Sequence, residues 1–312
     1  MSSEIKYLLP HKNFYKANLH ARSSRSDGRL SPEELKNAYK NKGYSVLALT
    51  DNKPSCEKTL SDKDFLVMSG FAFGAKSENT VPIKNAHFTA LSLTEEPQML
   101  PEFNGEYDLK NIASYISECK KHGYFTTYSH PAKSCLVMPE QLELSEVDAL
   151  EVINYSSLME GQDEYNAVCY DNFLRRNHRL FCTASDGNRH LLPLDDKRSD
   201  SFGAYTYINS DTLDYASIAS SIKNGEFYAS EGPEIKGLWI KGDTVNIRTS
   251  PADRIFLCAG RRACRSFQAN GGVPLTAAAF QLHPKDIYVR FVVIDEEGRR
   301  AYTRAYYLDE MM

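Results

Sequence analysis

Histidine, aspartate and asparagine side chains stand where several short, apolar or β-branched runs of the sequence end. They are His20, Asp51, Asn52, His130 and Asp186. The carboxyl ends of parallel strands meet at one edge of a sheet or barrel, so we expect these side chains to line one pocket. Imidazole and carboxylate ligands together suit Zn, Mn or Fe and disfavour a thiolate site. This pattern predicts the layout of a metal site.

Strand-like and helix-like segments alternate up to about residue 225, and this alternation predicts a parallel sheet. The strand candidates lie at 17–20, 44–50, 65–70, 87–93, 124–129, 149–153, 179–184 and 204–208. The clearest helix begins at the capping box Ser31-Pro32-Glu33-Glu34 and ends at Gly43. Further helices are predicted from Asp108, near 161–177 and near 212–224. About seven or eight strand–helix units fit a closed barrel.

A second region follows Gly232-Pro233, where the rhythm of the sequence changes. Short strands joined by tight turns are predicted at 234–241, 243–249, 253–259, 277–282, 286–295 and 300–308. Because no helix is predicted between them, we expect a small antiparallel sandwich of about 80 residues. The sequence therefore predicts two domains, residues 1–232 and 233–312.

The stretch 17–52 resembles two motifs of the polymerase and histidinol phosphatase (PHP) family of metal-dependent phosphoesterases. In that family the first motif reads His-x-His, Ser-Asp-Gly and a helix starting Ser/Thr-Pro-Glu-Glu, and the second reads Leu-Thr-Asp-His. The resemblance continues in order through Ser69-Gly70-Phe71-Ala72, His87-Phe88-Thr89-Ala90-Leu91, His130-Pro131, Leu150-Glu151-Val152-Ile153-Asn154, Thr183-Ala184-Ser185-Asp186 and the segment 222–233. It implies an α/β fold with a PHP-like distorted (β/α)7 barrel, followed by a small C-terminal antiparallel β-sandwich.

The same resemblance implies an incomplete set of metal ligands. The ligands that it retains are His20, Asp27, His87, His130 and Asp186. Arg22 replaces the second histidine of the first motif, and Asn52 replaces the histidine of the second. Ala72 replaces a glutamate that bridges metals in the family, and His190 comes one place later than the family's last histidine.

The replacement by Arg22 is the most severe of these changes. A guanidinium is always protonated and cannot ligate, so it puts a fixed positive charge where a metal would sit. Ala72 lacks the carboxylate that allows two cations to lie about 3.5–4 Å apart. Asn52 offers an oxygen but no imidazole nitrogen. We therefore expect one divalent metal (Zn, Mn or Fe) or none, and no complete cluster.

Two interpretations of the site remain open. In the first, one metal is held by some of the retained ligands, and no catalytic residue is assigned. In the second, Arg22 replaces the charge of the metal and the pocket binds a small phosphorylated or anionic ligand. The residues expected to contact that ligand are Arg22, Asn52, Arg25 and His190. Glu151 either orients a site residue or decorates a strand, and His87 opens a predicted strand instead of ending one.

Composition argues against several classes of partner. The formal net charge is −4, which gives no electrostatic reason to expect nucleic acid or a membrane surface. No apolar run approaches the roughly 20 residues that span a bilayer, and the first residues do not read as a secretory signal. A cytoplasmic location is therefore expected. The 7 cysteines show no Cys-x-x-Cys pair, which favours reduced thiols.

Three functions are compatible with this sequence. The favoured hypothesis is a PHP-like protein with a partly lost metal cluster, which binds a small anionic ligand and has weak or no hydrolytic activity. The first alternative is an active phosphoesterase that uses a reduced metal site. The second alternative is an interaction protein that acts through residues 233–312.

Overall fold

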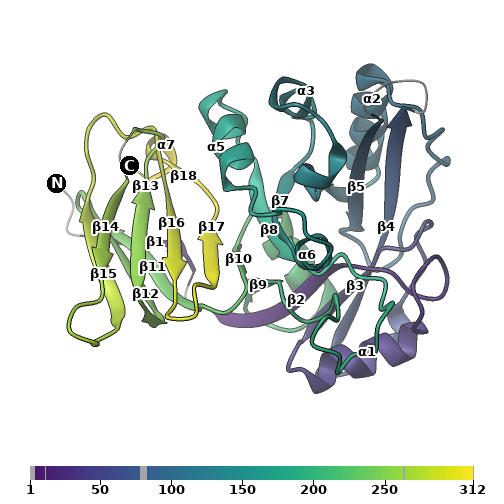
Figure 1. The fold of residues 1–312 in the computed structure, drawn as a ribbon, viewed down its shortest axis with the longest axis horizontal. Coiled ribbons are helices and arrows are strands. Elements are labelled where there is room, and N and C mark those ends of the chain that lie inside the picture. Colours follow the sequence, from purple (N-terminus) through teal and green to yellow (C-terminus); the bar gives the residue numbers. More distant parts are fainter. Residues whose placement is uncertain (1–3, 11, 78–82, 263, 312) are drawn as a thin grey trace.

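The structure is a computed structural model that describes residues 4–10, 12–77, 83–262 and 264–311. It is mixed α/β, with one large mixed sheet, one smaller sheet and short helices among the described residues (Figure 1). The strands of the first region are β2 (Asn13–Ala21), β3 (Val46–Leu49), β4 (Leu66–Ser77), β5 (Lys84–Ser92), β6 (Tyr124–Ser129), β7 (Ala149–Asn154), β8 (Phe181–Ser185), β9 (Tyr205–Ser210) and β10 (Phe227–Ser230). Its helices are α1 (Pro32–Asn41), α2 (Leu109–Lys121), α3 (Met138–Leu142), α4 (Tyr155–Met159), α5 (Ala167–Arg175) and α6 (Tyr215–Lys223), with 3₁₀ turns η1 (Lys58–Leu60) and η2 (Pro131–Ser134).

The large sheet is mixed, so the prediction of a parallel sheet is wrong for part of it. β2, β3 and β4 are parallel, and so are β6, β7 and β8. In contrast, β5 runs antiparallel to both β4 and β6, and β9 runs antiparallel to β2. For the β4–β5 pair the physical reason is the short connection between Ser77 and Lys84, because a parallel pairing needs a crossover of about a dozen residues.

The chain that follows β8 returns to β2, at the other end of this part of the sheet. The backbone N–H of Gly187 donates to the carbonyl of His20 at 2.9 Å, and that of Arg22 donates to the carbonyl of Asn188 at 3.2 Å. These bonds bring the end of β8 beside the end of β2. The residues that follow both strands therefore lie close together.

Local sequence signals agree well with the elements of the first region. In α1, the Ser31 side chain accepts from the backbone N–H of Glu34, whose side chain accepts from the backbone N–H of Ser31. This is the predicted capping box. Gly43 follows the helix with φ +75°, the left-handed conformation that glycine adopts without a steric penalty. The helix buries Leu35 and Tyr39 against the sheet.

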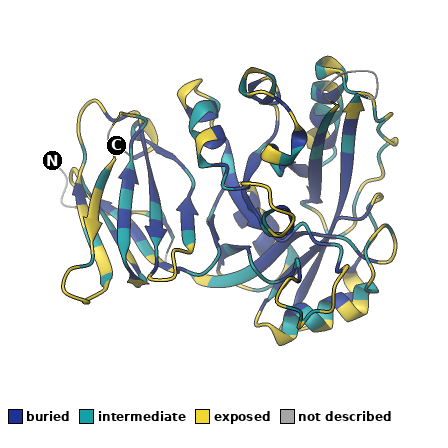
Figure 2. Cartoon of the chain, viewed as in Figure 1, coloured by how far each residue is buried: buried dark blue, intermediate teal, exposed yellow. Residues whose placement is uncertain are grey.

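The strands of the second region belong to two sheets. Its elements are β11 (Ile235–Lys241), β12 (Thr244–Ala252), β13 (Arg254–Cys258), β14 (Arg265–Gln268), β15 (Leu275–Gln281), β16 (Tyr288–Ile294), β17 (Arg300–Thr303), β18 (Tyr306–Tyr307) and α7 (Leu308–Met311). β14, β13, β16 and β17 continue the large sheet through β10, while β11, β12 and β15 belong to the smaller sheet. One buried apolar cluster, which includes Ile247 and Phe291, draws residues from both sheets. Figure 2 shows in dark blue the buried parts of the strands in both regions.

The first strand of the chain, β1 (Ile5–Leu9), belongs to this second region. It pairs antiparallel with β11 at the edge of the smaller sheet, although its sequence gave no strand signal. The first and last described elements, β1 and α7, therefore both lie in the second region, as Figure 1 shows. Within the described residues, no helix is both long enough and apolar enough to cross a bilayer.

Candidate functional site

Histidine side chains from separate strands meet at one end of the large sheet. His20 lies near the end of β2, and His130 follows β6 directly. Their rings are stacked, with centroids 6.0 Å apart. The ring of His87 meets that of His130 edge to face at 5.1 Å. His87 lies near the start of β5, and it reaches this end of the sheet because β5 runs antiparallel to its neighbours.

The carboxylate of Glu151 in β7 contacts His20 and the backbone of His130. Its buried carboxylate accepts a hydrogen bond from the backbone N–H of His130 at 2.8 Å, and lies 3.3 Å from Nδ1 of His20. It also accepts from Nδ2 of Asn154 at 2.9 Å and from the hydroxyl of Ser185. The structure thus favours the first of the two roles that the sequence left open for Glu151, because its carboxylate holds His20 and the His130 backbone in place.

Burial favours the neutral form of two of the clustered imidazoles, those of His87 and His130. It lowers the pKa of His87 to about 4, and the nearby charge of Arg22 acts in the same direction. Burial also lowers the pKa of His130 well below its usual value, with smaller effects from His87 and His20. Nδ1 of His130 is buried and has no hydrogen-bond partner among the described residues. The cluster therefore offers neutral rings, one of them with an unused nitrogen.

Basic side chains surround the histidines. Arg22 is mostly buried, with its side chain 13% exposed, and its Nη1 donates to Asp27 at 3.1 Å and to Asn52 at 2.9 Å. Nε of Arg189 lies 2.9 Å from the other oxygen of Asp27. Lys133, in η2, forms an ion pair with Glu160. The exposed carboxylate of Asp27 therefore links two arginines at the entrance of the site.

These residues enclose a small cavity. Its volume of about 20 Å³ is roughly that needed by one water molecule. The lining residues are His20, Arg22, His87, His130, Lys133, Asn154, Ser156, Ser157, Gly187 and Arg189. Among these described lining residues, the permanent charges are those of Arg22, Lys133 and Arg189, and none is a carboxylate. We call this the histidine cavity.

The residues present do not fit the metal site that the resemblance implies. Among the described residues, no group of three or more His, Cys, Asp and Glu side chains is arranged to hold a metal ion. Asp186 is fully buried away from the cavity lining, and its carboxylate accepts from Tyr39 at 2.6 Å and from the backbone N–H groups of residues 202–204 at 2.8–3.1 Å. Burial raises its pKa to about 6.

The other residues that the sequence predicted to contact an anionic ligand are Asn52, Arg25 and His190. Asn52 contacts Arg22, as described above, but is not a lining residue. Arg25 points elsewhere and binds Ser55 at 2.8 Å and Glu57. His190 is buried beside Ser201, 3.0 Å from its hydroxyl, and burial lowers its pKa to about 4. Neither Arg25 nor His190 lines the cavity.

Asp51 does not line the histidine cavity, and its carboxylate makes local hydrogen bonds instead. One of its carboxylate oxygens accepts from the backbone N–H of Ser23 at 2.9 Å, and the other accepts from the Ser23 hydroxyl at 2.6 Å. The hydroxyl of Ser26 also donates to it. Asp51 thus fixes the loop that carries Arg22 and Asp27.

Two residues at or beside the candidate site could not be recognised from the sequence. Lys133 follows His130-Pro131, yet a single loop lysine is ordinarily a solvated surface charge. Gly74 lies opposite His87 across the β4–β5 pair. A Cβ atom at Gly74 would come within 2.8 Å of the His87 ring, so only glycine leaves room for that ring.

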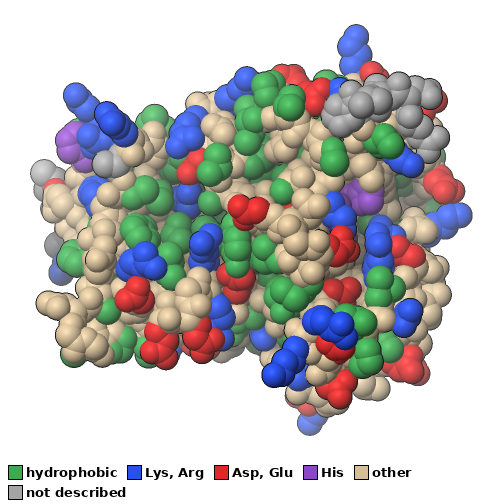
Figure 3. All heavy atoms as spheres, viewed as in Figure 1, with side chains coloured by type: hydrophobic (Ala, Val, Ile, Leu, Met, Phe, Trp, Pro, Cys, Tyr) green, Lys and Arg blue, Asp and Glu red, His purple; other side chains and the backbone are tan. Residues whose placement is uncertain are grey.

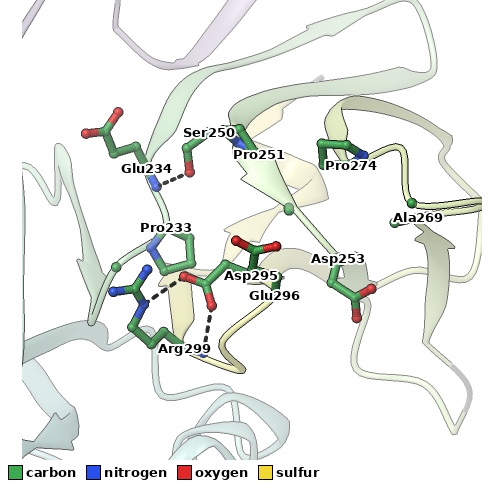
Figure 4. Close-up of a pocket in the computed structure, with 13 residues that line it drawn as sticks. Pro233, Glu234, Ser250, Pro251, Asp253, Ala269, Pro274, Asp295, Glu296 and Arg299 are labelled. Carbon is green, nitrogen blue, oxygen red and sulfur yellow. Dashed lines mark hydrogen bonds and ion pairs between the residues drawn. The ribbon is translucent and has the colours of Figure 1, made fainter.

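A larger cavity of about 540 Å³ lies at one end of the second region (Figure 4). Pro233, Pro251 and Pro274 form part of its wall, and Asp295 pairs with Arg299 at 2.8 Å. Its other charged lining residues are Glu234, Asp253 and Glu296. This cavity has the opposite charge to the histidine cavity. On the face that Figure 3 shows, by contrast, basic and acidic side chains are mixed over the surface.

Comparisons with known proteins found no matching family model and no matching curated protein. Solved structures do match. One is a two-domain protein containing a predicted PHP-like metal-dependent phosphoesterase from Bacteroides vulgatus, with a TM-score of 0.48 and 14% identity, covering 96% of this chain and 98% of that chain. Another is an amidohydrolase from Chromobacterium violaceum with bound SO4 and no metal, with a TM-score of 0.39 and 12% identity, covering 54% of this chain and 86% of that chain.

A metal-dependent phosphoesterase from Bifidobacterium adolescentis also matches, with a TM-score of 0.38 and 13% identity. The match covers 55% of this chain and 86% of that chain. None of the three TM-scores reaches 0.5. The first of these structures is named for a PHP-like metal-dependent phosphoesterase, the kind of protein that the sequence of this chain resembles, and the third is named as a metal-dependent phosphoesterase.

Proposed function

We propose that this chain is a PHP-family relative that binds a small phosphorylated or otherwise anionic ligand at the histidine cavity, with weak or no hydrolytic activity. In this proposal residues 1–232 form a PHP-like distorted (β/α)7 barrel and residues 233–312 form a β-sandwich. One observation carries the functional part. The described lining of the histidine cavity contains Arg22, Lys133 and Arg189 but no carboxylate.

This charge pattern opposes a bound cation. At an effective dielectric constant of about 20, one positive charge about 5 Å from a bound cation costs about 3 kcal/mol per unit of its charge. Asp27 and Glu160 offset part of the cost, because they pair with Arg22 and Lys133. Neither of these carboxylates lines the cavity, however. A bridging carboxylate, which multinuclear sites require, is absent from the described lining.

The same groups suit an anion. Arg22 and Arg189 present guanidinium N–H groups, which bind carboxylate and phosphate oxygens in pairs. Neutral imidazoles each retain one N–H donor, and the hydroxyls of Ser156 and Ser157 lie in the same lining. A phosphate group is larger than the cavity, so binding requires Arg22 and Arg189 to move apart. Asp27, which joins them, gives way to the ligand in this proposal.

A second candidate function rests on the histidine rings. The imidazole rings of His20, His87 and His130 lie together, and Nδ1 of His130 has no partner among the described residues. Neutral imidazole is a good ligand for Zn, Mn or Fe. This observation favours a phosphoesterase that works with a reduced metal site, and it is the alternative that the test must separate from anion binding.

The test is a calorimetric titration of the full chain with inorganic phosphate, in buffer with and without a strong chelator. Anion binding through basic side chains predicts the same affinity in both buffers. If the chelator abolishes phosphate binding, the reduced metal site is correct. If phosphate binds in neither buffer, the anion-binding proposal is refuted.

A further inference from the structure

A second cavity adjoins the histidine cavity and differs from it in chemistry. Its volume is about 360 Å³, within the range of small-molecule sites. Phe71 and Phe73 from β4, Phe103 from the loop before α2, and Tyr115 from α2 form its aromatic wall. Figure 1 shows α2 beside the strands β4 and β5, where these elements meet. We call this the aromatic cavity.

The rings of the aromatic wall hold one another in place. The centroid of Phe73 lies 4.9 Å from that of Tyr115 and 5.5 Å from that of Phe103, and Phe103 lies 5.0 Å from Tyr115. The hydroxyl of Tyr115 donates to the carbonyl of Pro101 at 2.8 Å, which fixes the loop to the helix. The wall is therefore formed before any ligand arrives, so a ligand ring need not order it.

Two contacts connect the aromatic cavity with the histidine cavity. Asn52 lines the aromatic cavity and accepts the 2.9 Å hydrogen bond from Arg22, which lines the histidine cavity. Gly74 lines the aromatic cavity, and the ring of His87 lies over its Cα. Residues that line the two cavities are thus in direct contact.

The histidine cavity suits a charged group of a ligand, and the aromatic cavity suits an apolar group. The histidine cavity supplies unbalanced positive charge but almost no volume. The aromatic cavity supplies volume and apolar surface. Its charged lining residues Lys53 and Glu102 lie 3.6 Å apart, so their opposite charges offset each other. The aromatic wall offers ring faces and one hydroxyl, that of Tyr115, which already donates to Pro101, so it makes few hydrogen bonds to a polyhydroxylated ligand. A flat apolar group fits that wall better.

We propose that the ligand of this site is an organic phosphate whose substituent is aromatic or otherwise apolar. The phosphate lies at the entrance of the histidine cavity against Arg22, and the ring lies in the aromatic cavity against Phe73 and Phe103. This inference rests on the proposed anion-binding function and adds the chemical class of the ligand to it.

The test compares methylphosphonate with phenylphosphonate, which carry the same anionic group and differ in the ring. Neither is a phosphate ester, so hydrolysis cannot confuse the measurement. The full chain is titrated with each by calorimetry at the same pH. We expect phenylphosphonate to bind about tenfold more tightly, since burying even part of a phenyl ring has an effect of this size.

Substitutions of two phenylalanine residues test where the ring of phenylphosphonate binds. Phe103→Ala should remove most of the advantage of phenylphosphonate over methylphosphonate. The matched control is Phe267→Ala, which removes a ring that is 46% exposed in the second region, and it should preserve the advantage. Thermal unfolding of each variant verifies that it is folded.

The outcomes separate this inference from the function on which it rests. If neither phosphonate binds the native chain, the anion-binding function itself fails. If both bind with equal affinity, the site is anionic but the aromatic cavity plays no part, and the inference is overturned. The inference is also overturned if Phe103→Ala weakens both ligands equally, or if Phe267→Ala removes the advantage.

Discussion

Replacing Arg22 by methionine removes one guanidinium and keeps a side chain of comparable reach. The Arg22 side chain is 13% exposed, lines the histidine cavity and is held between Asp27 and Asn52. A hydrogen bond to a charged group contributes about 1.5–3 kcal/mol. Since about 1.4 kcal/mol corresponds to a tenfold change in Kd, Arg22→Met should weaken phosphate binding about 10- to 150-fold.

The assay is calorimetric titration with inorganic phosphate near pH 7.5, where burial keeps His87 neutral because it lowers the pKa of this residue to about 4. The matched control is Arg25→Met, which removes an arginine of the same loop that binds Ser55 and Glu57 outside the cavity. We expect the control to keep the native affinity within about threefold. Equal losses in the two variants, or no loss in Arg22→Met, would refute the reasoning from the cavity lining.

Three further predictions follow from contacts in and near the site. Asp27→Asn should tighten phosphate binding about fivefold, because it removes a carboxylate that competes for Arg22 and contributes about 1 kcal/mol. His87→Gln should flatten the rise of stability with pH between about 4 and 6.5 by up to about 1.4 kcal/mol per pH unit, since the pKa of His87 falls from 6.5 to about 4 on folding and the unfolded chain binds more protons in that window. Asp171→Ala should lower the free energy of unfolding by about 3–5 kcal/mol in urea, because it leaves buried Arg290 without the carboxylate that binds it at 2.7 Å.

Each of these predictions has a contrary result. A weaker phosphate affinity in Asp27→Asn would mean that Asp27 supports the ligand instead of competing with it. An unchanged pH profile in His87→Gln, with unfolding followed at each pH, would mean that His87 titrates normally. For the ion pair, the control is Asp253→Ala, whose partner Arg254 is itself 43% exposed and should contribute no more than about 1 kcal/mol. Similar losses in the two variants would contradict the role of burial.

Local signals predicted much of the first region because they depend on neighbouring residues. Ser31 and Glu34 form the capping box that their spacing predicts, and β6 has the predicted bounds Tyr124–Ser129. The direction of β5 could not be predicted in this way, since it depends on a pairing with β4 and not on the strand itself. Because β5 runs antiparallel to its neighbours, His87 reaches the site although it lies near the start of its strand.

Non-local contacts account for most of what the sequence did not reveal. β1 gave no strand signal because it acquires its partner, β11, from the far end of the chain. Lys133 and Gly74 became site residues only through packing against the histidines. In the same way, the sulfur atoms of Cys258 and Cys264 lie 3.1 Å apart, although their spacing in sequence suggested no pair.

The resemblance to the PHP family predicted His20, Asp27, His87, His130 and Asp186 as metal ligands, and this role stays a prediction, although the structure places the rings of His20, His87 and His130 side by side. Asp186 illustrates why residue types alone were insufficient. Its carboxylate is taken up by Tyr39 and three backbone N–H groups, a contact set that depends on how residues 202–204 fold back onto β8. A motif specifies a residue type, but it does not specify what that side chain binds.

The metal content of the full chain, purified without chelator and measured by plasma mass spectrometry, tests the central claim most directly. A histidine cavity whose described lining has basic groups and no carboxylate predicts far less than one equivalent of Zn, Mn or Fe per chain. About one equivalent or more of a transition metal, lost in a folded His130→Ala variant, would contradict it.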